Sequence, residues 1–123
     1  MLSITDSELD ILKLLWKYGR LSGREIHSRL SGKTGWAYTT TRTVIERMVK
    51  KKLASREIFH GLNLYKAETT RVAAFADKIA NFADSVLDSD PAELVPLFVK
   101  HGTLSEQEIE ELKQLLDSME AEK

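Results

Sequence analysis

Five consecutive residues, Thr39-Thr40-Thr41-Arg42-Thr43, carry hydroxyl or guanidinium groups. β-Branched residues are mediocre helix formers, so a run of threonines is an unusual choice for a merely solvated helix face. Threonine hydroxyls and methyl groups can contact base edges or phosphates, and arginine can bind guanine through two hydrogen bonds. The run therefore favours contact with a nucleic acid over the alternative of an ordinary solvated surface.

Basic side chains continue on the C-terminal side of this run. Lys50-Lys51-Lys52 can bind phosphates, although a basic last turn also complements the dipole of a helix. Arg56 follows four residues later, in a segment predicted below to be a β-strand. The residues predicted to contact DNA are Thr39, Thr40, Arg42, Thr43, Arg47, Lys50, Lys51 and Arg56.

The distribution of charge also points to a polyanion. The 123 residues include 18 Lys and Arg and 19 Asp and Glu, for a net charge of -1. Through Lys66 the chain holds 13 basic and 6 acidic residues, a net of +7, whereas from Ala67 onward it holds 5 and 13, a net of -8. This division suggests that the basic half faces a polyanion while the acidic half is kept away from it, although small proteins often have an uneven charge distribution. Together with the architecture predicted below, it matches double-stranded DNA best.

Other chemistry has little support in the sequence. The chain has no cysteine, which excludes thiolate catalysis and cysteine-based metal sites. His27, His60 and His101 are far apart and lack the spacing of paired metal ligands, and the six glycines form no phosphate-binding motif. We therefore predict a protein that is not an enzyme and that binds neither a cofactor nor a metal.

One local pattern predicts the starts of three helices. In a capping box, a Ser or Thr side chain caps the N3 amide while a Glu three residues later reaches back to the amide of the cap. The pattern occurs at residues 4–9, 21–26 and 104–109, each time between apolar residues. It predicts helices that begin near Asp6, Gly23 and Glu106, of which the first ends before Gly19 and the second near Leu30.

A further helix is expected from Tyr38 or Thr39 to Lys51. Its apolar positions predict a buried face made of Thr41, Val44, Ile45 and Met48. At about 100° per residue, that face turns Thr39, Thr43, Glu46, Arg47 and Lys50 outward and leaves Thr40 and Arg42 on the two flanks.

Two short strands are predicted after this helix, over residues 54–59 and 62–66. They are joined by His60-Gly61, where glycine supplies the positive φ of a two-residue turn. Three helices followed by a hairpin is the order of elements in a winged helix-turn-helix. We therefore predict a mainly α fold with a small β-hairpin, in which residues 1–68 form a winged-helix DNA-binding domain and residues 69–123 a helical dimerisation domain.

Apolar residues at intervals of three and four follow in the C-terminal part. One stripe lies on a helix expected from Thr69 to about Leu87, and a second begins at Ile109. These helices could instead pack on the N-terminal domain as a satellite core. We predict a dimer interface, formed by Phe75, Ile79, Phe82, Val86, Leu94, Phe98, Ile109, Leu112 and Leu116.

The run from Trp36 to Leu53 resembles the DNA-reading helix of the penicillinase repressor family, bacterial repressors of β-lactamase and methicillin-resistance genes. Residues 9–16, 94–99 and 104–112 are also similar to the family, so the resemblance covers nearly the whole chain. It implies that an N-terminal winged helix binds a palindromic operator and that C-terminal helices form the dimer. By resemblance, Thr40, Arg42 and Thr43 match the principal DNA-contacting positions.

The resemblance also bears on control of the repressor. Resistance-type members are inactivated when a membrane sensor-protease signals cleavage in the segment that matches residues 94–99, here at Leu97 and Phe98. Leu97 stands where those repressors have asparagine, and Pro96 is a further departure. Lys52 occupies a position where the family commonly has glycine, which implies a strain of roughly 1 kcal/mol if the residue is left-handed.

Together these features predict a homodimeric transcriptional repressor that binds a palindromic operator through the helix near residues 38–52. The alternative is a winged-helix protein-interaction module that binds an acidic protein partner. The N-terminus has no basic region followed by an apolar stretch, and no apolar run approaches the roughly 20 residues of a membrane helix. We therefore expect a cytoplasmic protein.

Overall fold

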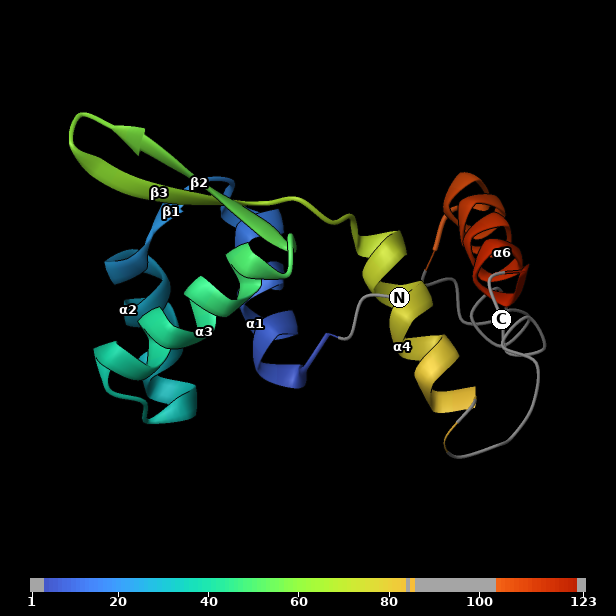
Figure 1. Cartoon of the computed structure of the whole chain (residues 1–123), viewed down its shortest axis with the longest axis horizontal. Helices are drawn as coiled ribbons and strands as arrows, with labels where there is room; N and C mark the ends of the chain where they lie inside the picture. Colours follow the sequence, from blue (N-terminus) through green and yellow to red (C-terminus); the bar gives the residue numbers. More distant parts are fainter. Residues whose placement is uncertain (1–3, 84, 86–103, 122–123) are drawn as a thin grey trace. The chain divides into compact units, whose positions relative to one another are not determined.

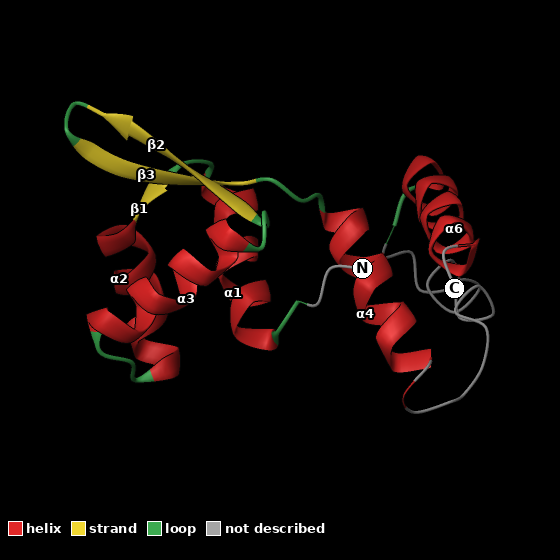
Figure 2. Cartoon of the chain, in the orientation of Figure 1, coloured by secondary structure: helices red, strands yellow, loops and turns green. Residues whose placement is uncertain are grey.

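The computed structural model describes residues 4–83, 85 and 104–121 of the chain (Figure 1). The chain forms two compact units. The first unit spans Thr5–Thr69, and the second joins Ile4 to the described residues from Thr70 onward. Among the residues described, all the strands belong to the first unit (Figure 2). Within the described residues, no helix is both long enough and apolar enough to cross a membrane.

Helix α1 (Asp6–Tyr18) begins at the predicted residue, because Thr5 and Glu8 form the complete capping box. It ends at Gly19, whose amide donates to the carbonyl of Leu15 and whose φ of 80° suits glycine. The apolar spacing predicts a buried face of Leu9, Leu12, Leu15 and Trp16, of which Leu12 and Leu15 are buried and Trp16 is half-buried. Leu9 is half-buried, and Glu8 takes a place in the core beside the apolar residues Ile11, Leu12 and Leu15.

Helix α2 (Gly23–Thr34) also starts with the predicted capping box, here between Ser22 and Glu25. It continues four residues beyond the predicted end near Leu30. Within these residues the Ser31 and Thr34 hydroxyls donate to the carbonyls of Ser28 and Leu30. The left-handed Gly35 then ends the helix. Helix α3 (Tyr38–Lys50) follows with the predicted buried face of Thr41, Val44, Ile45 and Met48.

Strands β2 (Ala54–Phe59) and β3 (Leu62–Ala67) form the predicted hairpin, turning at His60 and Gly61 with φ values of 50° and 76°. A third strand, β1 (Leu21–Ser22), was not predicted from the sequence and pairs antiparallel with Tyr65 and Leu64 of β3. The sheet order is β1-β3-β2. The short strand ties the start of α2 to the hairpin.

The core of the first unit combines side chains from all three helices and from Leu53, which follows α3. Its largest fully buried apolar members are Ile11, Leu12, Ile26, Ile45, Met48 and Leu53. Burial of such side chains stabilises a fold by about 1.5–3 kcal/mol each. Trp16 links α1 to the last residue of the unit, because its indole nitrogen donates to the carbonyl of Thr69 at 2.9 Å.

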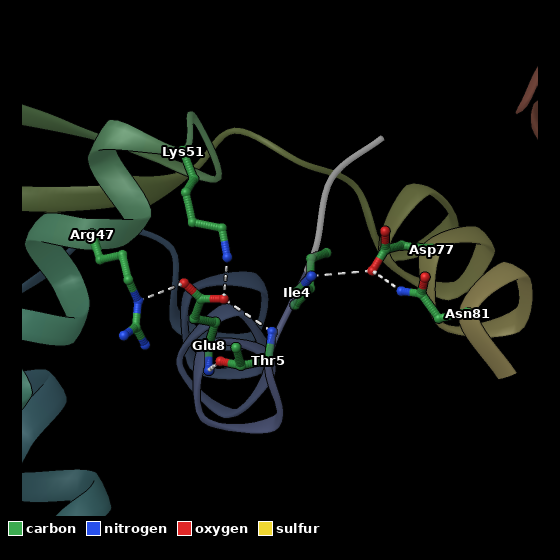
Figure 3. Close-up of polar contacts among 7 residues, drawn as sticks. All are labelled: Ile4, Thr5, Glu8, Arg47, Lys51, Asp77 and Asn81. Carbon is green, nitrogen blue, oxygen red and sulfur yellow. Dashed lines mark hydrogen bonds and ion pairs between the residues drawn. The ribbon is translucent and has the colours of Figure 1, made fainter. Parts of the chain in front are cut away.

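The second unit is built on α4 (Arg71–Phe82) and α6 (Glu106–Ala121), which pack against each other. Their small core contains Val72, Ala76, Ile79, Ala80, Leu112 and Leu116. Asp77 of α4, with no exposed surface, accepts hydrogen bonds from the Ile4 amide at 3.1 Å and from Asn81 at 3.3 Å (Figure 3). Ser105 and Glu108 form the third predicted capping box.

The residues predicted for a dimer interface fall into three groups in this unit. Ile79, Leu112 and Leu116 are buried in the intrachain core, with Phe75 and Ile109 partly buried against it. Phe82 is 49% exposed. Val86, Leu94 and Phe98 lie outside the described residues, as do Leu97 and the predicted end of α4 near Leu87. The dimer interface stays a prediction.

Candidate nucleic-acid interface

The outward face of α3 gathers most of the predicted DNA contacts. Because Thr41, Val44, Ile45 and Met48 point into the core, the other side of the helix remains in solvent. A shallow hollow on this side is lined by Thr39, Arg42, Thr43, Glu46, Arg47 and Lys50. Thr40 is also exposed. One surface therefore presents hydroxyls, guanidinium groups and an ammonium group together.

Tyr38 fixes the start of α3 against α2. A Cβ at Gly23 would lie 3.1 Å from the Tyr38 hydroxyl, so glycine leaves room for this close approach. The guanidinium of Arg24 lies 3.8 Å from the Tyr38 ring centroid, and the His27 ring meets Tyr38 edge-on at 5.5 Å. His27 also shares a 2.8 Å hydrogen bond with the buried Thr41 hydroxyl. These contacts hold the first turn of the exposed face in a defined orientation.

Thr43 has its hydroxyl proton engaged within α3. Its Oγ1 donates to the carbonyl of Thr39 at 2.9 Å, a bond typical of threonine in helices. The side chain can then offer DNA only its methyl group and the lone pairs of its oxygen. The sequence does not predict this hydrogen bond, which limits the contacts that Thr43 can make with DNA.

Glu8 joins α1 to the basic side of α3 (Figure 3). Its Oε1 accepts from Lys51 Nζ at 2.7 Å and from the Thr5 amide at 2.9 Å, and its Oε2 accepts from Arg47 Nε at 3.3 Å. Burial alone would raise the pKa of Glu8, but the hydrogen bonds and charge of Lys51 and the Thr5 amide bring it below its ordinary value. The carboxylate therefore stays ionised and orients both cations.

Arg56, predicted as a DNA contact, forms a salt bridge with Glu46 of α3. Its Nη1 donates to both carboxylate oxygens of Glu46, at 2.9 and 3.2 Å. The Tyr65 hydroxyl donates to Glu46 Oε1 at 3.3 Å. Burial chiefly, helped by the charge of Glu46, raises the pKa of Tyr65, so its hydroxyl stays protonated. The cluster fastens the hairpin to the middle of α3.

The hairpin itself is apolar at its tip. Ile58, Phe59 and Leu62 are 76%, 57% and 54% exposed, and His60 packs edge-on against Phe59. Closer to the sheet, Glu57 binds Arg20 at 3.1 Å and Lys66 at 3.2 Å. Among the residues that the structure describes, no group of three or more His, Asp or Glu side chains could hold a metal ion.

Two members of these clusters, Glu8 and Tyr65, were not predicted as part of the site. Glu8 was assigned only to a helix cap, although it stands at the apolar spacing of Ile11, Leu12 and Leu15, a position where a carboxylate must find cations. Tyr65 carried no signal, because its role depends on a strand register that brings it opposite Arg56.

Three helices with a helix-turn-helix between α2 and α3, followed by a hairpin fastened to α3, define a winged helix-turn-helix protein. Comparison with known proteins identifies the family within this class. The chain belongs to the penicillinase repressor family, whose profile matches residues 4–118. The predicted fold, family and class of winged-helix DNA-binding repressor are thereby confirmed.

Several relatives match along most of their length. The chain is 25% identical to the penicillinase repressor of Bacillus licheniformis, covering 93% of this chain and 89% of that protein. It is 26% identical to the methicillin resistance regulatory protein MecI of Staphylococcus aureus, covering 93% of each. Among solved structures, the monomeric form of BlaI from Bacillus licheniformis in complex with the blaP half-operator matches with a TM-score of 0.51 and 25% identity. That match covers 56% of this chain and 84% of that one.

Proposed function

We propose that two copies of this chain bind a palindromic operator and repress transcription by occluding a promoter. In each copy, α3 lies in the major groove, where Thr40, Arg42 and Thr43 read base edges. Thr39 and Lys50 contact phosphates on either side. Arg47 and Lys51, oriented by Glu8, add positive charge beside the same groove.

The observation that carries this proposal is the outward face of α3. A helix on which two threonines, two arginines and a lysine line one hollow offers base-reading and phosphate-binding groups on a single surface. The relative in complex with the blaP half-operator supports DNA as the partner. The basic charge of the first 66 residues supplies salt-dependent affinity.

A two-fold symmetric operator requires a paired protein. Two α3 helices held about one DNA turn apart, or a multiple of it, match the half-sites of a palindrome. The acidic second unit is the part suited to pairing, since it carries the exposed Phe82 and its net negative charge is unsuited to binding DNA.

Relief of repression by proteolysis is the second part of the proposal. Resemblance to resistance-type repressors supports a cut at Leu97 and Phe98, signalled by a membrane sensor-protease. Replacement of Phe98 by proline should then prevent both loss of the full-length chain and loss of repression when the inducer is added. Induction without any change in chain length would overturn this part alone.

A binding assay across a salt series tests the main proposal. The purified chain is mixed with a pool of random duplexes, bound molecules are recovered and sequenced, and their affinity is measured from 50 to 200 mM salt. We expect a two-fold symmetric consensus and an affinity that falls steeply with salt. Binding to an acidic protein without any sequence-preferring DNA complex would favour the protein-interaction module.

A further inference from the structure

Glu46 is the acidic side chain in the hollow on α3. It lies one turn after Arg42 and Thr43 and one turn before Lys50, so it shares their outward face. Its side chain is 40% exposed. A carboxylate on a surface that meets phosphates is repelled by them, and such a residue needs a compensating interaction to be tolerated there.

The contacts of Glu46 supply that compensation and also fix the direction of the carboxylate. Arg56 Nη1 neutralises its charge with bonds of 2.9 and 3.2 Å, and the Tyr65 hydroxyl adds a third bond at 3.3 Å. Two of the three bonds end on Oε1 and one on Oε2. Since a carboxylate oxygen can accept two hydrogen bonds, Oε2 keeps acceptor capacity among the residues that the structure describes.

We propose that Glu46 determines specificity by accepting a hydrogen bond from the N4 amino group of a cytosine in each half-site, while Arg56 acts as its positioning residue. The proposal rests on the function proposed above. In the major groove, guanine presents acceptors only, and thymine an acceptor and a methyl group. Adenine has an acceptor beside its amino group, which repels a carboxylate, so cytosine is the base that Glu46 favours.

This assignment changes the role predicted for Arg56. With Nη1 committed to Glu46, Arg56 fixes the reading carboxylate and joins the hairpin to α3. Its removal should then alter the base preference at the position that Glu46 reads. A phosphate contact would instead change affinity equally on all sequences.

The test compares base preferences in selections from random duplexes. Wild type should require cytosine at one position of each half-site, Glu46→Ala should lose that preference, and Glu46→Gln should shift it toward adenine, because glutamine pairs with adenine N6 and N7. Arg56→Ala should weaken the same position and Arg56→Lys should restore part of it. Glu57→Gln is the matched control, because Glu57 is a similarly exposed, salt-bridged carboxylate that binds Arg20 and Lys66.

A second measurement targets the atom itself. Replacing the selected cytosine by 2-pyrimidinone removes only the N4 amino group, and it should weaken wild type by roughly tenfold and Glu46→Ala hardly at all. The inference is overturned if Glu46→Ala keeps every base preference and changes only overall affinity. Failure of wild type to select any sequence would instead overturn the proposed function. Thermal unfolding of each variant shows that it is folded.

Discussion

Lys51 Nζ lies 2.7 Å from Glu8 Oε1, and the carboxylate it meets has no exposed surface. A buried anion is tolerated only where cations and hydrogen-bond donors surround it. Arg47 and the Thr5 amide complete that environment. The first turn of α1 therefore determines where two basic side chains of the DNA-reading region stand.

Replacing Glu8 by alanine should destabilise the first unit strongly. The change removes a fully buried side chain with its ion pairs to Arg47 and Lys51, leaves a cavity and removes one half of a capping box, so the free energy of unfolding should fall by about 2–3 kcal/mol. Urea denaturation measures it. Glu25→Ala is the control, because Glu25 holds the same capping position on α2 while being exposed. A similar loss in both variants would show that the cap, not the cluster, matters.

Acid should destabilise the protein partly through Glu8. Although burial raises its pKa, the contacts of Lys51 and Thr5 lower the pKa below the ordinary value. The folded state therefore holds the proton less tightly than the unfolded state, and the contribution, present at neutral pH, is lost as the pH falls through the lowered pKa. Glu25 contributes in the same direction. Unfolding free energies measured from pH 7 to pH 3 should fall less in Glu8→Gln than in wild type, and equal falls would contradict this.

Thr43 should read DNA through its methyl group. Its hydroxyl proton is bound to the carbonyl of Thr39, so the methyl group is free to meet a thymine methyl. Thr43→Ala and Thr43→Ser should each cost about 1–3 kcal/mol on the selected operator and little on random DNA. Thr43→Val keeps the methyl group and should bind nearly as well as wild type. Fluorescence titration measures these affinities. If the Thr43→Ser variant binds the operator better than the Thr43→Val variant, the side-chain oxygen makes the DNA contact.

Lys52→Gly should stabilise the protein. Lys52 is left-handed, with a φ of 65°, and it is exposed, so its side chain contributes little packing. The relief of strain, partly offset by the greater freedom of glycine in the unfolded chain, should add about 0.5–1 kcal/mol. Lys52→Ala should add nothing, because alanine meets the same strain. Thermal unfolding compares the three proteins.

Phe82→Asp tests the proposed pairing of two chains. Phe82 is exposed at the end of α4, so a charge there should disturb an interface and leave the α4–α6 core intact. We expect a monomer in sedimentation and an operator affinity lowered far more than one added charge explains. A variant that still sediments as a dimer would remove Phe82 from the interface.

Features that depend on neighbouring residues in the sequence were predictable. Capping boxes gave the starts of α1, α2 and α6, and helical periodicity gave the buried face of α3. Features that depend on distant partners were not. Strand β1 exists because Tyr65 and Leu64, more than 40 residues further along the chain, lie beside it.

The candidate site divides in the same way. The side chains that line the α3 hollow follow from the angle between successive residues, and they were anticipated as a group. Their partners were not, because Glu8 and Tyr65 reach α3 only through tertiary packing. In the folded protein, ion pairs with Glu8 orient Arg47 and Lys51, and an ion pair with Glu46 orients Arg56.

The hairpin tip has a consequence for how much active protein a cell holds. Phe59 and Leu62 face each other across the turn, and with Ile58 they leave apolar surface in water. Surfaces of this kind attract one another as concentration rises. Tip-to-tip association would store a growing share of the molecules away from their operators, so repression should rise less than proportionally with expression.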